Sequence, residues 1–270
     1  MSEDQGKKQV LLDIKTVADK LQLPLLVVGA GARILVFDNR YNVEGRTTID
    51  LDVAVQVNNW SDFQVLSEEM TQGSNPIFQA TRVQHKFIHI ATGIEIDVVP
   101  FGAIGKPNQK IQWVDGNQMN VLGLDEAFST AELQQIEELE IKVISVTAFI
   151  VLKLIAWSDR KARKDLEDIY FILDKYDIID ILTEENQDLQ GIVEHQEAAA
   201  FFVGCQIKRT FSQTVINELE QILTKILQKQ NVLFPQLISL IFDQDEWDAK
   251  FYTIVAKFEA LQKGIEFTSS

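Results

Sequence analysis

Cysteine is nearly absent from this chain of 270 residues, which contains Cys205 and no other. One cysteine excludes an internal disulfide, and the sequence has no Cys/His spacing of the kind that zinc sites use. The histidines form no metal cluster either, because His85 and His89 are expected on one strand face whereas His195 lies far along the chain. The serine-nucleophile pattern Gly-x-Ser-x-Gly is also missing. Zinc chemistry and this type of serine hydrolysis are therefore excluded.

The sequence has neither a secretory signal nor a long apolar run. We therefore expect a soluble, cytoplasmic protein without a membrane partner. A hydrophobic fraction of 46% favours a packed core over disorder. At this length a single core tends to divide. We predict an α+β fold in which residues 1–145 form a catalytic domain, a mixed β-sheet with flanking helices, and residues 146–270 form a helical domain that completes a nucleotide cleft.

Positive charge is also in short supply, because 25 Lys and Arg stand against 40 Asp and Glu and the net charge is −15. Proteins that grip nucleic acid across a broad face are usually basic there, so a large RNA footprint is not expected. The basic residues in or near the motif segments described below are Arg33, Arg40, Arg46, Arg82, Lys86, Lys153, Arg160, Lys161, Arg163 and Lys164. An RNA end therefore remains compatible with a local basic cleft.

Two aspartates alternate with aliphatic residues in residues 48–55. A period of two is typical of a half-buried strand, on which side chains two apart share a face. Asp50 and Asp52 should therefore point the same way. Two carboxylates this close repel each other and take up a proton unless a cation lies between them, so the pair favours a divalent metal. An oxygen-only site favours Mg²⁺ or Mn²⁺ over Zn²⁺.

The same alternation returns in residues 93–101, where Glu95 and Asp97 fall on one face. If this strand neighbours the first, Asp97 joins the two aspartates. A third carboxylate can bind one metal and accept the proton of an attacking hydroxyl, which is typically worth about 10² to 10⁴ in rate. Glu95 remains a competing candidate.

Upstream, residues 25–28 indicate a short buried strand that leads into a turn at Gly29, Ala30 and Gly31, and residues 32–37 indicate the start of a helix. Such an arrangement presents backbone N–H groups and the positive end of a helix dipole to phosphate. Residues 38–45 are expected to form a loop over the site, from which Arg40 and Arg46 reach a substrate.

Taken in order, residues 28–33 (Val-Gly-Ala-Gly-Ala-Arg), 46–52 (Arg-Thr-Thr-Ile-Asp-Leu-Asp) and 96–102 (Ile-Asp-Val-Val-Pro-Phe-Gly) resemble the DNA polymerase β-like nucleotidyltransferase superfamily. Residues 152–160 (Leu-Lys-Leu-Ile-Ala-Trp-Ser-Asp-Arg) and 164–169 (Lys-Asp-Leu-Glu-Asp-Ile) are similar to the Lys, Arg and Lys/Arg-Asp signature of the AbiEii/AbiGii toxin nucleotidyltransferases. The resemblance covers about residues 20–175.

The resemblance implies a two-metal site on Asp50, Asp52 and Asp97, with a nucleoside triphosphate as donor. It also implies a set of residues that bind or orient this nucleotide: Gly29, Ala30, Gly31, Arg33, Arg46, Lys153, Arg160, Asp165 and Asp168. Lys153 and Arg160 are seven residues apart, so one helix can aim both the same way. The alternative for Lys153, Arg160 and the two aspartates is a solvated helix face with internal ion pairs.

Elsewhere, residues 10–21, 60–70 and most of 146–270 show helical spacing, whereas residues 133–136 and 139–144 indicate a hairpin. Two apolar stripes in the last third, around Leu219 and Phe258, are expected to be core. The expected function is metal-dependent transfer of a nucleoside monophosphate to an acceptor hydroxyl. The acceptor implied by the resemblance is an RNA or tRNA 3′ end, and the implied setting is toxin–antitoxin or phage defence, with an antitoxin or a second copy as partner.

Two other functions remain open from the sequence. One is a regulator or pseudoenzyme that binds a nucleoside triphosphate without turnover. The other is nucleotidyl transfer to a small molecule or a protein side chain, for which an acidic surface suits a cationic acceptor.

Overall fold

The computed structural model describes residues 3–45, 50–72, 75–136, 139–176, 194–238 and 243–267. The chain forms two compact units. The first comprises Met1–Arg40 and Arg46–Phe149, and the second comprises Tyr41–Gly45 and Ile150–Ser270. Arg46 and the first residues of the expected Asp-x-Asp strand lie outside the described residues.

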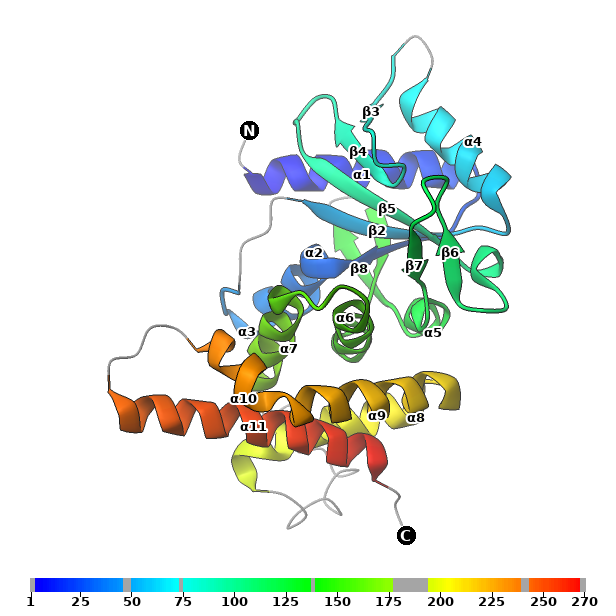
Figure 1. Cartoon of the computed structure of the whole chain (residues 1–270). Helices are drawn as coiled ribbons and strands as arrows, with labels where there is room; N and C mark the ends of the chain where they lie inside the picture. The colour runs from blue at the N-terminus through cyan, green and yellow to red at the C-terminus, as the bar shows by residue number, and fades with distance from the viewer. Residues whose placement is uncertain are drawn as a thin grey trace. The chain divides into compact units, whose positions relative to one another are not determined.

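The first unit is built on a seven-stranded sheet with the order β3-β4-β5-β2-β1-β9-β8 (Figure 1). It is mixed, because β2 runs parallel to β5 and β1 parallel to β9, while the other neighbours are antiparallel. The strands are β1 (Leu25–Val28), β2 (Leu51–Gln56), β3 (Phe78–Ala80), β4 (Lys86–His89), β5 (Glu95–Phe101), β8 (Glu132–Ile136) and β9 (Leu139–Val143). The predicted α+β class with a mixed sheet is confirmed.

Helices and one small hairpin complete this unit: α1 (Glu3–Lys20), α2 (Gly29–Arg33), the π-helix η1 (Ile34–Asp38), α3 (Asn39–Tyr41), α4 (Trp60–Thr71), the 3₁₀ helix η2 (Ala103–Gly105), β6 (Lys110–Gln112), β7 (Gln118–Asn120) and α5 (Leu124–Ser129). The β6–β7 hairpin was not predicted from the sequence. Residues 38–41, expected in a loop, are helical instead. Helix α1 is fixed to the sheet by Asp13, whose Oδ2 lies 2.9 Å from Nε2 of the buried His89.

The second unit is helical, as expected. It contains most of α6 (Val146–Arg160), followed by α7 (Arg163–Lys175), the 3₁₀ turn η5 (His195–Glu197), α8 (Ala198–Thr210), α9 (Gln213–Gln228), α10 (Gln230–Leu233), the 3₁₀ turn η6 (Phe234–Leu237) and α11 (Gln244–Glu266). The predicted stripe of α9 is buried, from Val215 to Ile226. On α11 the stripe is core at Phe258 and Leu261, whereas Trp247 and Phe251 are only partly buried. Cys205 is buried on α8.

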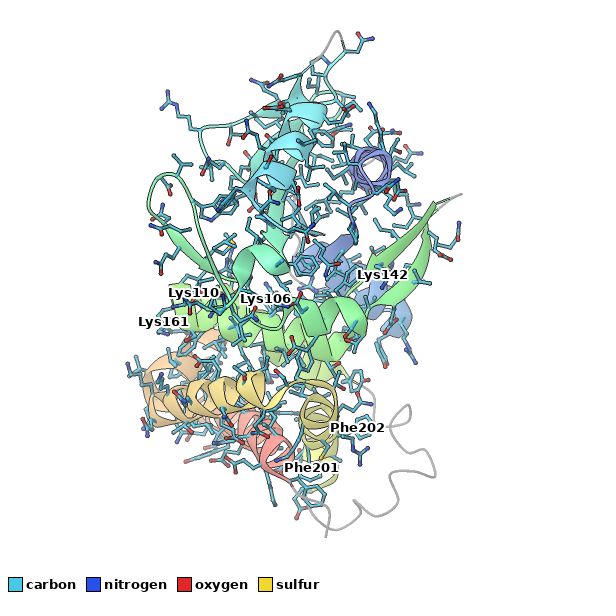
Figure 2. The ribbon with its side chains drawn as sticks, turned by 90° about the vertical axis from the view of Figure 1, so that its right-hand side faces the viewer. Lys106, Lys110, Lys142, Lys161, Phe201 and Phe202 are labelled. Atoms are coloured by element: carbon cyan, nitrogen blue, oxygen red, sulfur yellow. The ribbon has the colours of Figure 1, made fainter. Side chains whose placement is uncertain are left out.

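Helices α8 and α11 touch backbone to backbone. A β-carbon on Gly264 would lie 2.0 Å from the carbonyl oxygen of Phe201, and one on Gly204 would lie 2.3 Å from the carbonyl oxygen of Leu261. Figure 2 shows Phe201 and Phe202 on α8, and the ring centroid of Phe201 lies 5.4 Å from that of Phe267. Two glycines thus allow a helix contact that any side chain would block. Among the described residues, no helix is both long and apolar enough to cross a membrane.

Candidate active site

Gly29 and Asp52 meet where β1 passes into α2. Strand β1 ends at Val28, whose register partner on β2 is Asp52, and the helix begins at the next residue. Gly29 has φ +65, and a β-carbon there would lie 2.0 Å from Oδ2 of Asp52. The segment Gly29–Gly31 is therefore the first turn of α2 and not a separate turn as expected. Glycine is required at position 29 both by the backbone and by the carboxylate beside it.

Asp52 and Asp97 lie side by side on neighbouring strands. Strands β2 and β5 are parallel, and their register pairs Asp52 with Asp97. Paired residues of neighbouring strands point to the same face of a sheet, so the two carboxylates share a face. The two strands are neighbours, so the condition under which Asp97 joins the pair of aspartates is met. Asp50 lies just before β2 in a bend, and its side chain is partly buried.

Lys86 lies next to Asp97 on the following strand, and its place in the site was not predicted from the sequence. It is the register partner of Asp97 on β4, and its Nζ lies 2.8 Å from Oδ1 of Asp97 and 3.7 Å from Oε2 of Glu95. Burial acts to lower the pKa of Lys86, but the hydrogen bond and charge of Asp97, and then the charges of Glu95 and Asp50, raise that pKa overall. The carboxylate face thus carries a protonated amine.

The candidate metal ligands on this face suit a hard divalent cation. All are carboxylate oxygens, which are the ligands that Mg²⁺ and Mn²⁺ prefer, and the missing side chain of Gly29 leaves space for the carboxylate of Asp52. Within the described ranges, no three His, Cys, Asp or Glu side chains converge closely enough to hold a metal ion. The observed arrangement is a carboxylate pair with a lysine counter-charge on Asp97. By chemistry and face these residues fit a divalent metal.

Arg33, predicted to contact phosphate, is buried and paired. Its side chain is 1% exposed, with Nε 3.1 Å from Oδ1 and Nη2 3.1 Å from Oδ2 of Asp38. The pair joins the end of α2 to the end of η1. Ala30 and Gly31 are also buried within α2. A phosphate contact by Arg33 would require its buried guanidinium to become accessible, and it remains a prediction.

The four charged residues predicted on residues 153–168 form a connected ion-pair network in the second unit. Lys153 Nζ lies 2.6 Å from Oδ2 of Asp168 and 3.5 Å from Oδ1 of Asp165. Arg160 donates to both oxygens of Asp165, with Nε at 2.8 Å from Oδ2. Asp165 and Asp168 are buried, whereas the Arg160 side chain is 49% exposed. The alternative of a solvated face is therefore wrong for the aspartates, although the ion pairs that it included are present.

An aromatic cluster flanks Asp97 and was also missed from the sequence. His85 precedes β4, and its ring centroid lies 4.9 Å from that of Trp113, which in turn packs against Trp60 at 5.2 Å. Burial lowers the pKa of His85, against the opposing charge of Asp97. Trp113 enters through the unpredicted β6–β7 hairpin. His89 is buried and both of its ring nitrogens have partners: Nδ1 lies 2.8 Å from Oγ1 of Thr92, and Nε2 lies 2.9 Å from Oδ2 of Asp13.

Several solved structures are similar to this chain. A nucleotidyltransferase-like protein from Paracoccidioides brasiliensis is 16% identical over 88% of this chain and 94% of its own, with a TM-score of 0.45. The antibiotic-resistance factor ANT(2″)-Ia is 15% identical over 58% and 74%, with a TM-score of 0.36. The CCA-adding enzyme from Thermotoga maritima, solved with tRNA, is 13% identical over 96% and 83%, with a TM-score of 0.24.

No curated protein matches the sequence. The family model for the nucleotidyl transferase AbiEii toxin of type IV toxin–antitoxin systems matches residues 35–230, which is more than half of the chain. The matched range contains the carboxylates of β2 and β5 and the ion-pair network of residues 153–168, whereas Gly29 and Arg33 precede it. Sequence motifs, sheet register and family model agree, and the chain belongs to the AbiEii family of nucleotidyl transferase toxins.

Proposed function

We propose that this protein transfers a nucleoside monophosphate from a nucleoside triphosphate to an acceptor hydroxyl, with an RNA or tRNA 3′ end as the acceptor. The observation that carries the proposal is the register of β2 and β5, which sets Asp52 beside Asp97 on one sheet face. A rigid sheet holds these carboxylates more firmly than a loop would, which suits a reaction that depends on positioning.

In this proposal Asp50, Asp52 and Asp97 would hold Mg²⁺ or Mn²⁺. Bound metal ions would stabilise the negative charge on the attacking and leaving oxygens of an in-line displacement. Asp97 accepts the proton of the acceptor hydroxyl as its oxygen attacks the α-phosphate, and pyrophosphate leaves. The partly buried position of Asp97, with 19% of its side chain exposed, keeps it within reach of a substrate.

The same proposal assigns the phosphates to backbone N–H groups and to cations. The residue before α2 is Val28, whose side chain has no oxygen and makes no capping hydrogen bond. The backbone N–H groups of Gly29 and Ala30 are assigned to phosphate in this proposal. Lys153 and Arg160 of the second unit are assigned to the triphosphate on the family resemblance, and within that unit they pair with Asp168 and Asp165. An antitoxin protein is the partner that the family description implies.

The experiment is incubation of purified protein with Mg²⁺ and each α-³²P-labelled nucleoside triphosphate, with and without total RNA. The blank is Asp52→Ala, and Asp62→Ala, an aspartate of α4, is the matched control. We expect label in an RNA band for the natural protein and the control but not for the blank. Transfer that survives in Asp52→Ala would refute the carboxylate assignment.

The size of the labelled product separates the acceptors. Label found in a small molecule or on a protein would show that this molecule, and not RNA, is the acceptor. The net charge of −15 favours an acceptor that is a cation. Binding of triphosphate without any transfer would favour the regulator.

A further inference from the structure

Lys86, Asp97 and Asp52 form one row across three neighbouring strands. The register pairs Lys86 of β4 with Asp97 of β5, and Asp97 with Asp52 of β2. All three side chains therefore leave the same face of the sheet. The ammonium is placed by the strand itself, so its position next to Asp97 is part of the fold.

The ammonium lies between two carboxylates of β5. Its Nζ is 2.8 Å from Oδ1 of Asp97 and 3.7 Å from Oε2 of Glu95. The Lys86 side chain is 31% exposed and that of Glu95 is 55% exposed. Glu95, the competing candidate for the third carboxylate, is thus the more exposed of the two and forms an ion pair with Lys86.

Stability is a poor explanation for this ion pair. Ion pairs that solvent reaches contribute at most about 1 kcal/mol, because water screens the attraction and two long side chains lose freedom. The ion pair acts more directly on Asp97, because the ammonium lies 2.8 Å from its buried Oδ1 and partly balances its charge.

We propose that Lys86 is a positioning residue for Asp97. Its ammonium holds Oδ1, so that the second carboxylate oxygen faces the reacting groups, and it offsets the repulsion between Asp97 and Asp52. The inference rests on the proposed nucleotidyl transfer and adds to it a residue on which the reaction depends. Lys86 itself touches no substrate in this assignment, in contrast to a lysine that binds the triphosphate directly.

The two roles of a lysine differ in their kinetic effect. A positioning residue lowers kcat, because the carboxylate that it orients acts in the transition state. A triphosphate-binding residue raises KM, because it contributes to binding before the chemical step. The split between kcat and KM therefore tests the assignment.

The experiment compares Lys86→Met with Lys86→Arg, and uses Lys106→Met as the matched control. Lys106, which is labelled in Figure 2, belongs to the same unit. Its side chain is 60% exposed, and its Nζ lies 3.8 Å from Oδ2 of Asp125. Each protein is assayed for Mg²⁺-dependent transfer of label to total RNA over a range of triphosphate concentrations. Binding of Mn²⁺ is measured separately by electron paramagnetic resonance.

We expect Lys86→Met to lower kcat by about 10- to 100-fold, the usual cost of losing a residue that orients a metal-site ligand. KM for the triphosphate should change by less than about threefold. Mn²⁺ binding should persist, which also shows that the variant is folded. Lys86→Arg should recover at least about tenfold in kcat because it restores a charged donor, and Lys106→Met should match the natural protein.

Three results would overturn the inference. The first is a Lys86→Met protein in which neither kcat nor KM changes. The second is a Lys86→Met protein with unchanged kcat and raised KM, which would make Lys86 a substrate-binding residue. In both cases transfer by the natural protein leaves the proposed function intact. The third is a natural protein that neither binds Mn²⁺ nor transfers label, which overturns the proposed function and the role of Lys86 together.

Discussion

The α-carbon of Gly29 lies so close to the carboxylate of Asp52 that a β-carbon on the glycine would be 2.0 Å from Oδ2. This contact joins the first helical turn after β1 to the first half of β2. The glycine motif and the Asp-x-Asp motif are therefore one structural unit, although about twenty residues separate them in the sequence. A change at Gly29 should act on Asp52.

Gly29→Ala should reduce nucleotide transfer by at least about 100-fold, because displacement of a catalytic group by 1 Å can cost that much. The backbone strain of a side chain at φ +65 should also lower the free energy of unfolding by about 1 to 2 kcal/mol. Transfer assays and urea denaturation measure the two effects.

Gly93→Ala is the control for this variant. Gly93 has φ +73, and a β-carbon there would meet no atom within 4 Å. This substitution therefore introduces the backbone strain without the contact with Asp52, and we expect transfer close to that of the natural protein. Equal losses in both variants would show that backbone strain, and not the contact with Asp52, is what lowers transfer.

The buried pair of Arg33 and Asp38 should be important for stability. Arg33→Met leaves a buried carboxylate without its guanidinium, and loss of one partner of a buried pair typically costs about 3 to 5 kcal/mol. Arg33→Met/Asp38→Leu removes both charges and should recover most of this loss. Denaturant titration at low temperature measures all three proteins.

A different result would support the predicted phosphate contact of Arg33. In that case the double variant would be stable but would bind the triphosphate weakly, as isothermal titration calorimetry would show. Unchanged binding with restored stability would confine Arg33 to a structural role.

Because of Lys257, the free energy of unfolding of the second unit should vary with pH in the alkaline range. It is buried on α11 and donates to the carbonyl oxygen of Leu173 at 2.8 Å, and burial lowers its pKa from the usual 10.5. Between the lowered pKa and 10.5 the unfolded chain binds more protons than the folded chain. The free energy of unfolding should therefore rise with pH across this window, and the gain is lost as pH falls through the lowered pKa.

Urea denaturation at several pH values tests this expectation, with Lys257→Met as the comparison. The variant has no amine to titrate, so its curve should lack the rise that the natural protein shows. Parallel curves for the two proteins would contradict the role of Lys257.

The sequence predicted those elements whose local pattern decides their structure. Alternation located β2 and β5, and a buried stripe located α9. The β6–β7 hairpin was missed because its strands are three residues long and carry one buried side chain, Ile111. Such strands are too short to show a period.

The parts of the candidate site that a short sequence pattern reveals were proposed from the sequence. Asp50 and Asp52 are two residues apart on one expected strand, and Asp97 joins them if its strand is the neighbour. Lys86 was only one of several basic residues near the motifs, because its contact with Asp97 depends on antiparallel register. The burial of Arg33 likewise depends on the π-helical turn that returns Asp38 to it.

The backbone contact between α8 and α11 bears on how the protein is made. Gly204 and Gly264 are 60 residues apart in the sequence, so this contact requires closure of a long loop. A chain emerging from the ribosome exposes the α8 face until α11 has been synthesised. The helical unit therefore completes its core only after α11 has left the ribosome.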